Sequence, residues 1–265
     1  ALRPFFPAGC HVANLDHLVR EVMEARGELP DIAEVGPDVF GDMRRAVLAS
    51  SLAEAWRFDV LIVDEGQDFD AEMAATARHF LREGGELDWL EDPYQRLQER
   101  DYAHQGAVRL QLERNYRSPR RIAELLSPLL HLPGVVAANP IAGEEPRFHQ
   151  HDDASFHAML QQRVQEQLTR FAPEDVAIVS LKGRHRSRLT DDIVAGLRLR
   201  SFTGAYEADG RPVFSEGELR FETLFRFKGQ QAKAVILIDV DFEEINERNR
   251  NLLYCAMTRA TYSLD

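Results

Sequence analysis

A dense group of carboxylates follows an apolar segment in the stretch FDVLIVDEGQDFD, residues 58–70. Residues 58–63 predict a strand of a parallel sheet covered on both faces, and Asp64 and Glu65 follow directly at its carboxyl end. In parallel sheets, ligands bind beyond the carboxyl ends of the strands. A carboxylate there can hold a Mg²⁺ ion that bridges nucleotide phosphates, and a neighbouring glutamate can orient and deprotonate a water. The plainer alternative is a strand that simply meets solvent at its end.

Helical and strand patterns alternate along the chain around this stretch. Strands that alternate with helices predict an α/β fold with mostly parallel sheets, and a seam near 105–110 predicts two α/β units. Asp68 is expected to cap the helix that follows the acidic stretch. Helices are predicted at 11–26, 42–56, 70–83, 119–131, 154–170, 187–197 and 247–261. Strands are predicted at 58–63, 87–92, 109–113, 146–151, 176–181, 198–203, 219–225 and 234–241, and a hairpin or loop at 204–217.

The composition is that of a soluble globular protein. The chain has 265 residues, 44% of them hydrophobic and 29% charged, and no apolar run long enough to span a bilayer. It begins without the features of a signal peptide, and its two cysteines form no disulfide framework. We therefore expect a cytoplasmic protein with no membrane contact.

The net charge of −12 argues against non-specific binding of nucleic acid over the whole surface. It leaves room for a local basic groove, because phosphate contacts depend on where the Lys and Arg lie. The basic run KGRHRSR at 182–188 is one such place. A solvated loop is the simpler interpretation of this run, and a contact with phosphates is the alternative.

The full stretch DEGQD at 64–68 resembles motif II of the superfamily 1 helicases of the UvrD/Rep-like group. The stretch HVANLDHLV at 11–19 is a weaker match, to motif Ib. Four further stretches resemble motifs III to VI and follow in the order of that family. They are LEDPYQRL at 90–97, LERNYRSP at 112–119, ETLFRFKGQQAKAVIL at 222–237 and NLLYCAMTRA at 251–260.

The resemblance implies two RecA-like domains of the P-loop NTPase class, with ATP in the cleft between them. The first, at 1–107, would be incomplete and would carry motifs Ib to III, and the second, at 108–265, would carry motifs IV to VI. In the first domain, Asp64 would hold Mg²⁺, Glu65 would be the catalytic base and Gln95 would sense the γ-phosphate.

The resemblance also implies roles for residues of the second domain. Arg117 and Arg259 would neutralise charge on the transferring phosphoryl group, because a planar guanidinium grips two phosphate oxygens at once. Without the resemblance, Arg117 could simply cap or pair near the start of a helix, and Arg259 could be an ordinary charge on a helix surface. The remaining implied contacts are with adenine (Tyr116), with the nucleotide (Lys228, Gly229), with the ribose (Gln231) and with the DNA backbone (Thr223, Arg226).

The sequence departs from the family pattern in two main ways. It contains no G-x-x-x-x-G-K-[ST], the loop that cradles the β and γ phosphates. We expect either that this loop lies upstream of the given chain or that the protein is a remnant that has lost nucleotide binding. Motif V has Gln230 and Gln231 where Leu and Glu are usual, although glutamine can still bind a hydroxyl.

Two functional hypotheses remain open at this point. In the first, the chain is part of an ATP-dependent DNA helicase that moves along single-stranded or partly duplex DNA, and the resemblance implies the 3′ to 5′ direction. In the second, it is a catalytically inactive module that serves as a DNA- or protein-binding scaffold. The pathway served, the choice of DNA over RNA and the oligomeric state are not given by the sequence.

Overall fold

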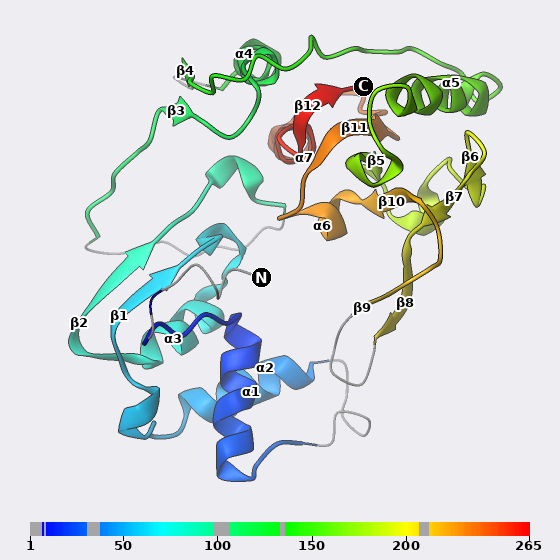
Figure 1. Cartoon of the computed structure of the whole chain (residues 1–265). Helices are drawn as coiled ribbons and strands as arrows, with labels where there is room; N and C mark the ends of the chain where they lie inside the picture. Colours follow the sequence, from blue (N-terminus) through cyan, green and yellow to red (C-terminus); the bar gives the residue numbers. More distant parts are fainter. Residues whose placement is uncertain (1–6, 8, 31–37, 98–106, 133–135, 207–211) are drawn as a thin grey trace. The chain divides into compact units, whose positions relative to one another are not determined.

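The computed structural model describes residues 7, 9–30, 38–97, 107–132, 136–206 and 212–265. The chain forms two compact units, Ala1–Ala107 and Val108–Asp265. Figure 1 shows the elements of both units. Within the described residues, no helix is long and apolar enough to cross a membrane.

The first unit packs helices against a two-stranded parallel sheet. Strand β1 pairs with β2, so that Val63 lies opposite Trp89 and the carboxyl ends of both strands lie side by side. Apolar side chains of α1 and α2, including Val22, Met43 and Val47, form the core with Phe80. The elements are α1 (Leu15–Arg26), α2 (Val39–Leu48), η2 (Glu54–Trp56), β1 (Phe58–Val63), η3 (Gly66–Asp68), α3 (Ala71–His79), β2 (Leu81–Trp89) and η4 (Pro93–Gln95).

The first strand has the predicted bounds but not the predicted burial. Only Val63 of β1 is buried, and Val60 and Ile62 are 51% and 58% exposed. Side chains at alternate positions of a strand point to the same face, so these two residues leave one face of β1 exposed. The expectation of a strand covered on both faces is therefore wrong for the described residues.

The second unit is built on a larger sheet with the order β12-β11-β5-β10-β7-β6. All its pairings are parallel except that of β6 with β7, and the central strand β5 is buried throughout. The core joins α5 to the inner strands through residues such as Leu160, Val164 and Ile178. The mixed α/β architecture with a mostly parallel sheet is as predicted.

The elements of the second unit can be followed in Figure 1. The helices are α4 (Arg120–Leu130), α5 (Phe156–Leu168), η5 (Pro173–Asp175), η6 (Arg184–Arg186), α6 (Leu224–Phe227) and α7 (Glu247–Met257). The strands are β3 (Arg114–Asn115), β4 (Val136–Ala137), β5 (Val176–Ser180), β6 (Ile193–Val194), β7 (Leu197–Arg200), β8 (Phe202–Tyr206), β9 (Pro212–Phe214), β10 (Leu219–Thr223), β11 (Ala232–Ile238) and β12 (Ala260–Leu264).

The predicted helix at 187–197 is wrong. The segment contains the short strand β6, which pairs with β7 through a tight turn at Ala195 and Gly196, whose φ angles are 53° and 82°. Two consecutive residues with positive φ are typical of a two-residue hairpin loop. Leu189, Ile193 and Leu197 recur every fourth residue, which imitates a helical pattern.

Two predicted strands are also absent from the described structure. Residues 109–113 have no regular structure, and only Arg114 and Asn115 form the short β3. Residues 146–151 form no strand either, although Arg147 N donates to Leu264 O at the edge of β12 (3.0 Å). A few isolated hydrogen bonds along an edge do not make a regular ladder.

Candidate active site

Asp64 and Glu65 lie at the carboxyl end of β1, as predicted. The backbone turns sharply there, because Glu65 has a φ of 54°, in the left-handed region. Asp64 is exposed, and its Oδ1 accepts a hydrogen bond from Glu65 N at 2.9 Å. Mg²⁺ is commonly held by one or two carboxylates with waters and substrate phosphates, so an exposed Asp64 fits that donor set.

A buried amide holds the Glu65 side chain. Gln67 is 2% exposed, and its Nε2 donates to Glu65 Oε2 at 2.5 Å. Its Oε1 accepts from Asp92 N at 3.0 Å, which ties the DEGQD turn to the loop after β2. Sequence reasoning missed Gln67, although its place two residues after a candidate base was a usable signal.

Asp92 continues this chain of contacts to Gln95. Its Oδ1 accepts from Tyr94 N at 3.1 Å and its Oδ2 accepts from Gln95 Nε2 at 2.9 Å. Gln95 is 6% exposed. The structure thus brings Glu65 and Gln95 together through Gln67 and Asp92, and Asp92 is a second residue that sequence reasoning missed.

Gly66 is fitted closely against Trp89. A Cβ atom at Gly66 would lie 2.0 Å from the Trp89 Nε1 atom, which no real contact permits. Phe69 packs edge-on against the same indole, with ring centroids 5.2 Å apart. The turn that carries Glu65 is therefore held by an aromatic side chain of the neighbouring strand.

The helix after this turn is not capped by Asp68. Asp68 lies in η3, and Asp70 is the cap of α3, because its side chain accepts from Met73 N at 2.8 Å. The expected role of Asp68 is thus wrong by two residues, since the short 3₁₀ turn delays the start of the helix.

The NYRSP segment of the second unit presents Tyr116 and Arg117 on the surface. Asn115 Oδ1 accepts from Arg117 N at 3.0 Å and from Ser118 N at 2.9 Å. An asparagine side chain that binds the backbone two residues on fixes a turn. Tyr116 is 61% exposed and Arg117 is exposed as well, so both are accessible to a ligand.

Arg259 lies at the end of α7 and is fully buried. Its Nε donates to Cys255 O at 2.9 Å, and its Nη2 donates to Thr258 Oγ1 at 3.2 Å. The guanidinium is thus engaged within its own helix end.

The segment 222–231 brings the predicted DNA-contact residues together. Thr223 and Arg226 line one small cavity of about 60 Å³ with Phe202, and the Arg226 guanidinium lies 3.3 Å from the Phe202 ring centroid. Gly229 has a φ of 80°, which favours glycine, and Gln231 is exposed. Lys228 follows the last residue of α6.

The sequence-predicted residues are divided between the two units. Asp64, Glu65 and Gln95 lie within the first unit. The second unit carries the other group, which consists of Tyr116, Arg117, Thr223, Arg226, Lys228, Gly229, Gln231 and Arg259. That the two groups act on one nucleotide stays a prediction. Among the described residues, no three His, Cys, Asp or Glu side chains form a metal-binding group.

One segment of the chain is similar to a known protein family. Residues 219–264, from β10 to β12, match the UvrD-like helicase C-terminal domain. The matched segment contains the stretches that resemble motifs V and VI. The resemblance to the UvrD/Rep-like superfamily 1 helicases is thereby confirmed, and it indicates a helicase-related function. No curated protein matches the chain.

Proposed function

We propose that the chain is part of an ATP-dependent superfamily 1 DNA helicase that translocates on single-stranded DNA. The observation that carries this proposal is the match of residues 219–264 to the UvrD-like helicase C-terminal domain. The match includes six of the residues to which the motifs give a role. They are Thr223, Arg226, Lys228, Gly229, Gln231 and Arg259.

The polar network of the first unit supports a role in ATP hydrolysis. Asp64 would hold Mg²⁺, which neutralises charge on the phosphates when it is bound. Glu65 would take the proton of the attacking water, and the Gln67 amide keeps its carboxylate in place. Gln95, linked to the same network through Asp92, would respond to the γ-phosphate.

The second unit would supply the remaining contacts. The exposed Tyr116 could stack on adenine, and the exposed Arg117 could reach the transferring phosphoryl group. Lys228 and Gly229 would approach the nucleotide, and Gln231 would bind the ribose. Arg259 can serve there only if its guanidinium leaves the contacts with Cys255 and Thr258. We propose RecA-like folds for both units, the first of them incomplete.

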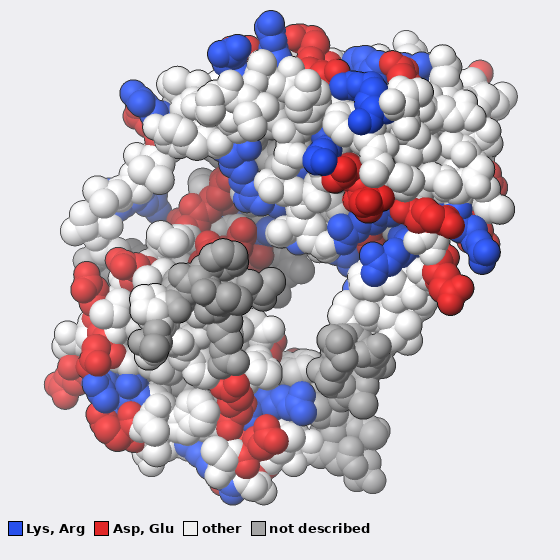
Figure 2. Space-filling view, in the orientation of Figure 1, with Lys and Arg blue, Asp and Glu red and all other residues white. Residues whose placement is uncertain are grey.

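The contact with DNA must be local rather than spread over the surface. Figure 2 shows acidic and basic side chains interspersed on the visible face of the second unit, without one large basic area. The candidate contacts are therefore Arg226 on α6, Thr223 directly before this helix, and the basic loop at 182–188.

A scaffold without catalytic activity is the second candidate function. The buried, internally bonded Arg259 favours it, as does the absence of a P-loop from the sequence given. The ordered network from Glu65 to Gln95 opposes it, because a scaffold has no need for a buried amide that positions an acidic side chain.

Binding of single-stranded DNA tests the proposal on the chain as it stands. We expect a fluorescent oligonucleotide to bind with a Kd of roughly 10⁻⁴ to 10⁻⁶ M, and the logarithm of the binding constant to fall linearly with that of the salt concentration. Arg226→Ala should reduce the salt slope by about 1, because one phosphate contact is lost.

Arg82→Ala is the matched control for this measurement, since Arg82 is ion-paired with Asp59 and Glu54 in the first unit. It should leave the affinity unchanged. Absence of binding at low salt, or binding that ignores salt, would contradict the DNA part of the proposal.

A further inference from the structure

A basic loop leaves the sheet of the second unit between β5 and β6. It starts after Ser180, the last residue of β5, and turns through η6. Five residues of this loop are basic or can become so. They are Lys182, Arg184, His185, Arg186 and Arg188.

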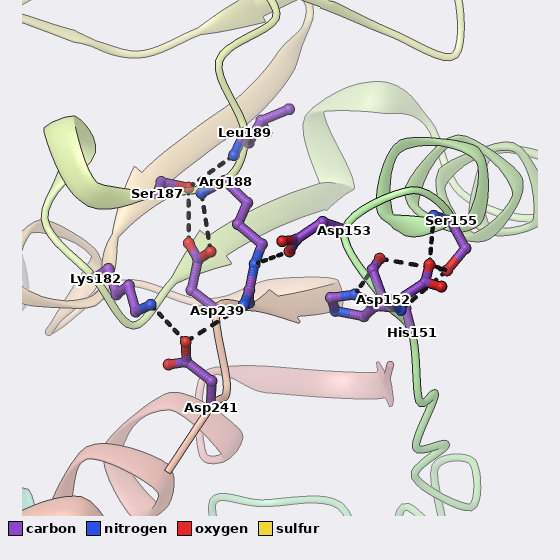
Figure 3. Close-up of polar contacts among 10 residues, drawn as sticks. All are labelled: His151, Asp152, Asp153, Ser155, Lys182, Ser187, Arg188, Leu189, Asp239 and Asp241. Carbon is purple, nitrogen blue, oxygen red and sulfur yellow. Dashed lines mark hydrogen bonds and ion pairs between the residues drawn. The ribbon is translucent and has the colours of Figure 1, made fainter.

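One buried carboxylate holds both ends of this loop, as Figure 3 shows in part. Asp239 follows β11, which pairs with β5 in parallel, so the carboxyl ends of the two strands are neighbours. Asp239 Oδ2 accepts from Ser180 Oγ at 2.5 Å and from Ser187 Oγ at 2.7 Å. Its Oδ1 accepts from Arg188 N at 3.0 Å.

Few side chains would be tolerated at the position of Asp239. The residue is 1% exposed and has a φ of 63°, in the left-handed region that asparagine and aspartate tolerate better than other side chains. A buried carboxylate is tolerated when hydrogen-bond donors surround it. Here those donors come from the two ends of the basic loop, so the carboxylate fixes the shape of the loop.

The exposed side chains of the loop are held by ion pairs, as Figure 3 also shows. Asp241 lies 2.5 Å from Lys182 Nζ and 3.6 Å from Arg188 Nη2. Arg188 Nε also contacts Asp153 at 3.1 Å. All these side chains are at least one-third exposed, so the pairs can open toward another anion.

The tip of the loop faces open space. No atom lies within 4 Å of the place where Gly183 would carry a Cβ. His185 and Arg186 are exposed, and Arg186 N donates back to Gly183 O at 2.8 Å, which closes the turn. An exposed turn with cationic side chains fits a phosphate of a nucleic-acid backbone.

We propose that Asp239 is a positioning residue that holds the loop at 182–188 in the shape in which it contacts a nucleic-acid phosphate. This inference rests on the proposed DNA contact and adds to it a residue that does not itself touch DNA. It predicts that removal of a negative charge weakens the binding of a polyanion, which is the opposite of what charge alone would do.

The test compares Asp239→Asn with Asp241→Asn in binding to a fluorescent single-stranded oligonucleotide over a range of salt. Asparagine tolerates the left-handed backbone, but its NH₂ group cannot accept the hydrogen bonds that Oδ2 accepts. We expect Asp239→Asn to weaken binding about five- to tenfold and to reduce the salt slope by about 1. Asp241→Asn removes the ion pair of Lys182 and one of the two ion pairs of Arg188, so it should strengthen binding about twofold.

Hydrogen exchange of the loop amides and thermal unfolding accompany both measurements. Asp239→Asn should speed exchange at 182–188 while the rest of the second unit keeps its protection. Ser187→Ala removes one of the three donors, so it gives a milder form of the same change if Asp239→Asn fails to fold.

Two results would overturn the inference while the proposed function stands. One is wild-type affinity in Asp239→Asn or Ser187→Ala although the loop exchanges faster. The other is weaker binding with an unchanged salt slope, as a smaller folded fraction alone would produce. If the wild-type chain shows no salt-dependent binding, the DNA part of the proposed function fails, and this inference fails with it.

Discussion

Replacement of Gly66 with alanine is expected to lower the free energy of unfolding by about 2–3 kcal/mol. The added methyl group would lie 2.0 Å from Trp89 Nε1 and 2.5 Å from Trp89 Cε2. The indole cannot turn away without loss of its edge-on contact with Phe69. Because the φ of Gly66 is not in the left-handed region, the effect should be purely steric.

Urea unfolding of four variants, namely Gly66→Ala, Gly183→Ala, Trp89→Phe and the double variant of Gly66 and Trp89, checks this prediction. Gly183→Ala is the matched control, since nothing lies within 4 Å of a Cβ there, and it should change stability by no more than about 0.5 kcal/mol. Trp89→Phe combined with Gly66→Ala should cost less than the sum of the two single changes, because the smaller ring leaves room for the methyl group. Additive costs would show that the Trp89 ring does not hold the turn.

The second prediction with a large effect concerns ATP hydrolysis. Its test needs a form of the protein that carries a P-loop segment. In such a form, Glu65→Gln should slow ATP hydrolysis by roughly 10²- to 10⁴-fold, because an amide cannot take the proton of the attacking water. Its oxygen can still accept from Gln67 Nε2, so the turn should keep its shape. Binding of a fluorescent ATP analogue should therefore change little.

Two comparisons make this result specific. Glu86→Gln, on an exposed position of β2, should hydrolyse ATP at the wild-type rate. The 265-residue chain itself should show no turnover, since its sequence lacks G-x-x-x-x-G-K-[ST]. Robust turnover by Glu65→Gln in the longer form would refute the assignment of Glu65, and robust turnover by this chain would refute the need for the P-loop.

The strands with continuous apolar runs could be predicted well from the sequence. Residues 58–63 form β1 with the predicted bounds, and 176–181 corresponds closely to β5, whereas the strand predicted at 234–241 overlaps β11 but extends three residues past its end. Such runs depend on local pattern and on burial in a parallel sheet. The pattern does not say which neighbours a strand has, so the exposure of Val60 and Ile62 was not foreseen.

The errors arose where tertiary contacts override local pattern. The spacing of Leu189, Ile193 and Leu197 suits a helix, but Ala195 and Gly196 take up left-handed conformations that join two antiparallel strands. Asp68 was a reasonable cap from its place in the sequence, yet the 3₁₀ turn at 66–68 moves the cap to Asp70.

Some residues of the candidate site could be placed from the sequence, and others could not. Asp64 and Glu65 could be placed from the sequence, because any residue after a parallel strand lies at the sheet edge. Asp92 and Asp239 could not, because their roles consist of hydrogen bonds between segments distant in sequence, such as Asp92 N to Gln67 and Asp239 to Ser180. The burial of Arg259 was likewise invisible in the motif that contains it.

The proposed function requires that residues of both units act on one nucleotide, and Arg117 offers the most direct test. Arg117 is exposed, so its replacement should not disturb the fold, whereas Arg259 is buried. Arg120, three residues further on and 49% exposed at its side chain, is the matched control.

The decisive measurement is the rate of phosphate release in a single turnover by a P-loop-bearing form of the protein. We predict that Arg117→Ala slows this step by roughly 10³-fold or more while Arg120→Ala does not, as expected when a guanidinium stabilises the transferring phosphoryl group. Phosphate release at the wild-type rate in Arg117→Ala, with Glu65→Gln inactive, would contradict the claim that the second unit completes the site.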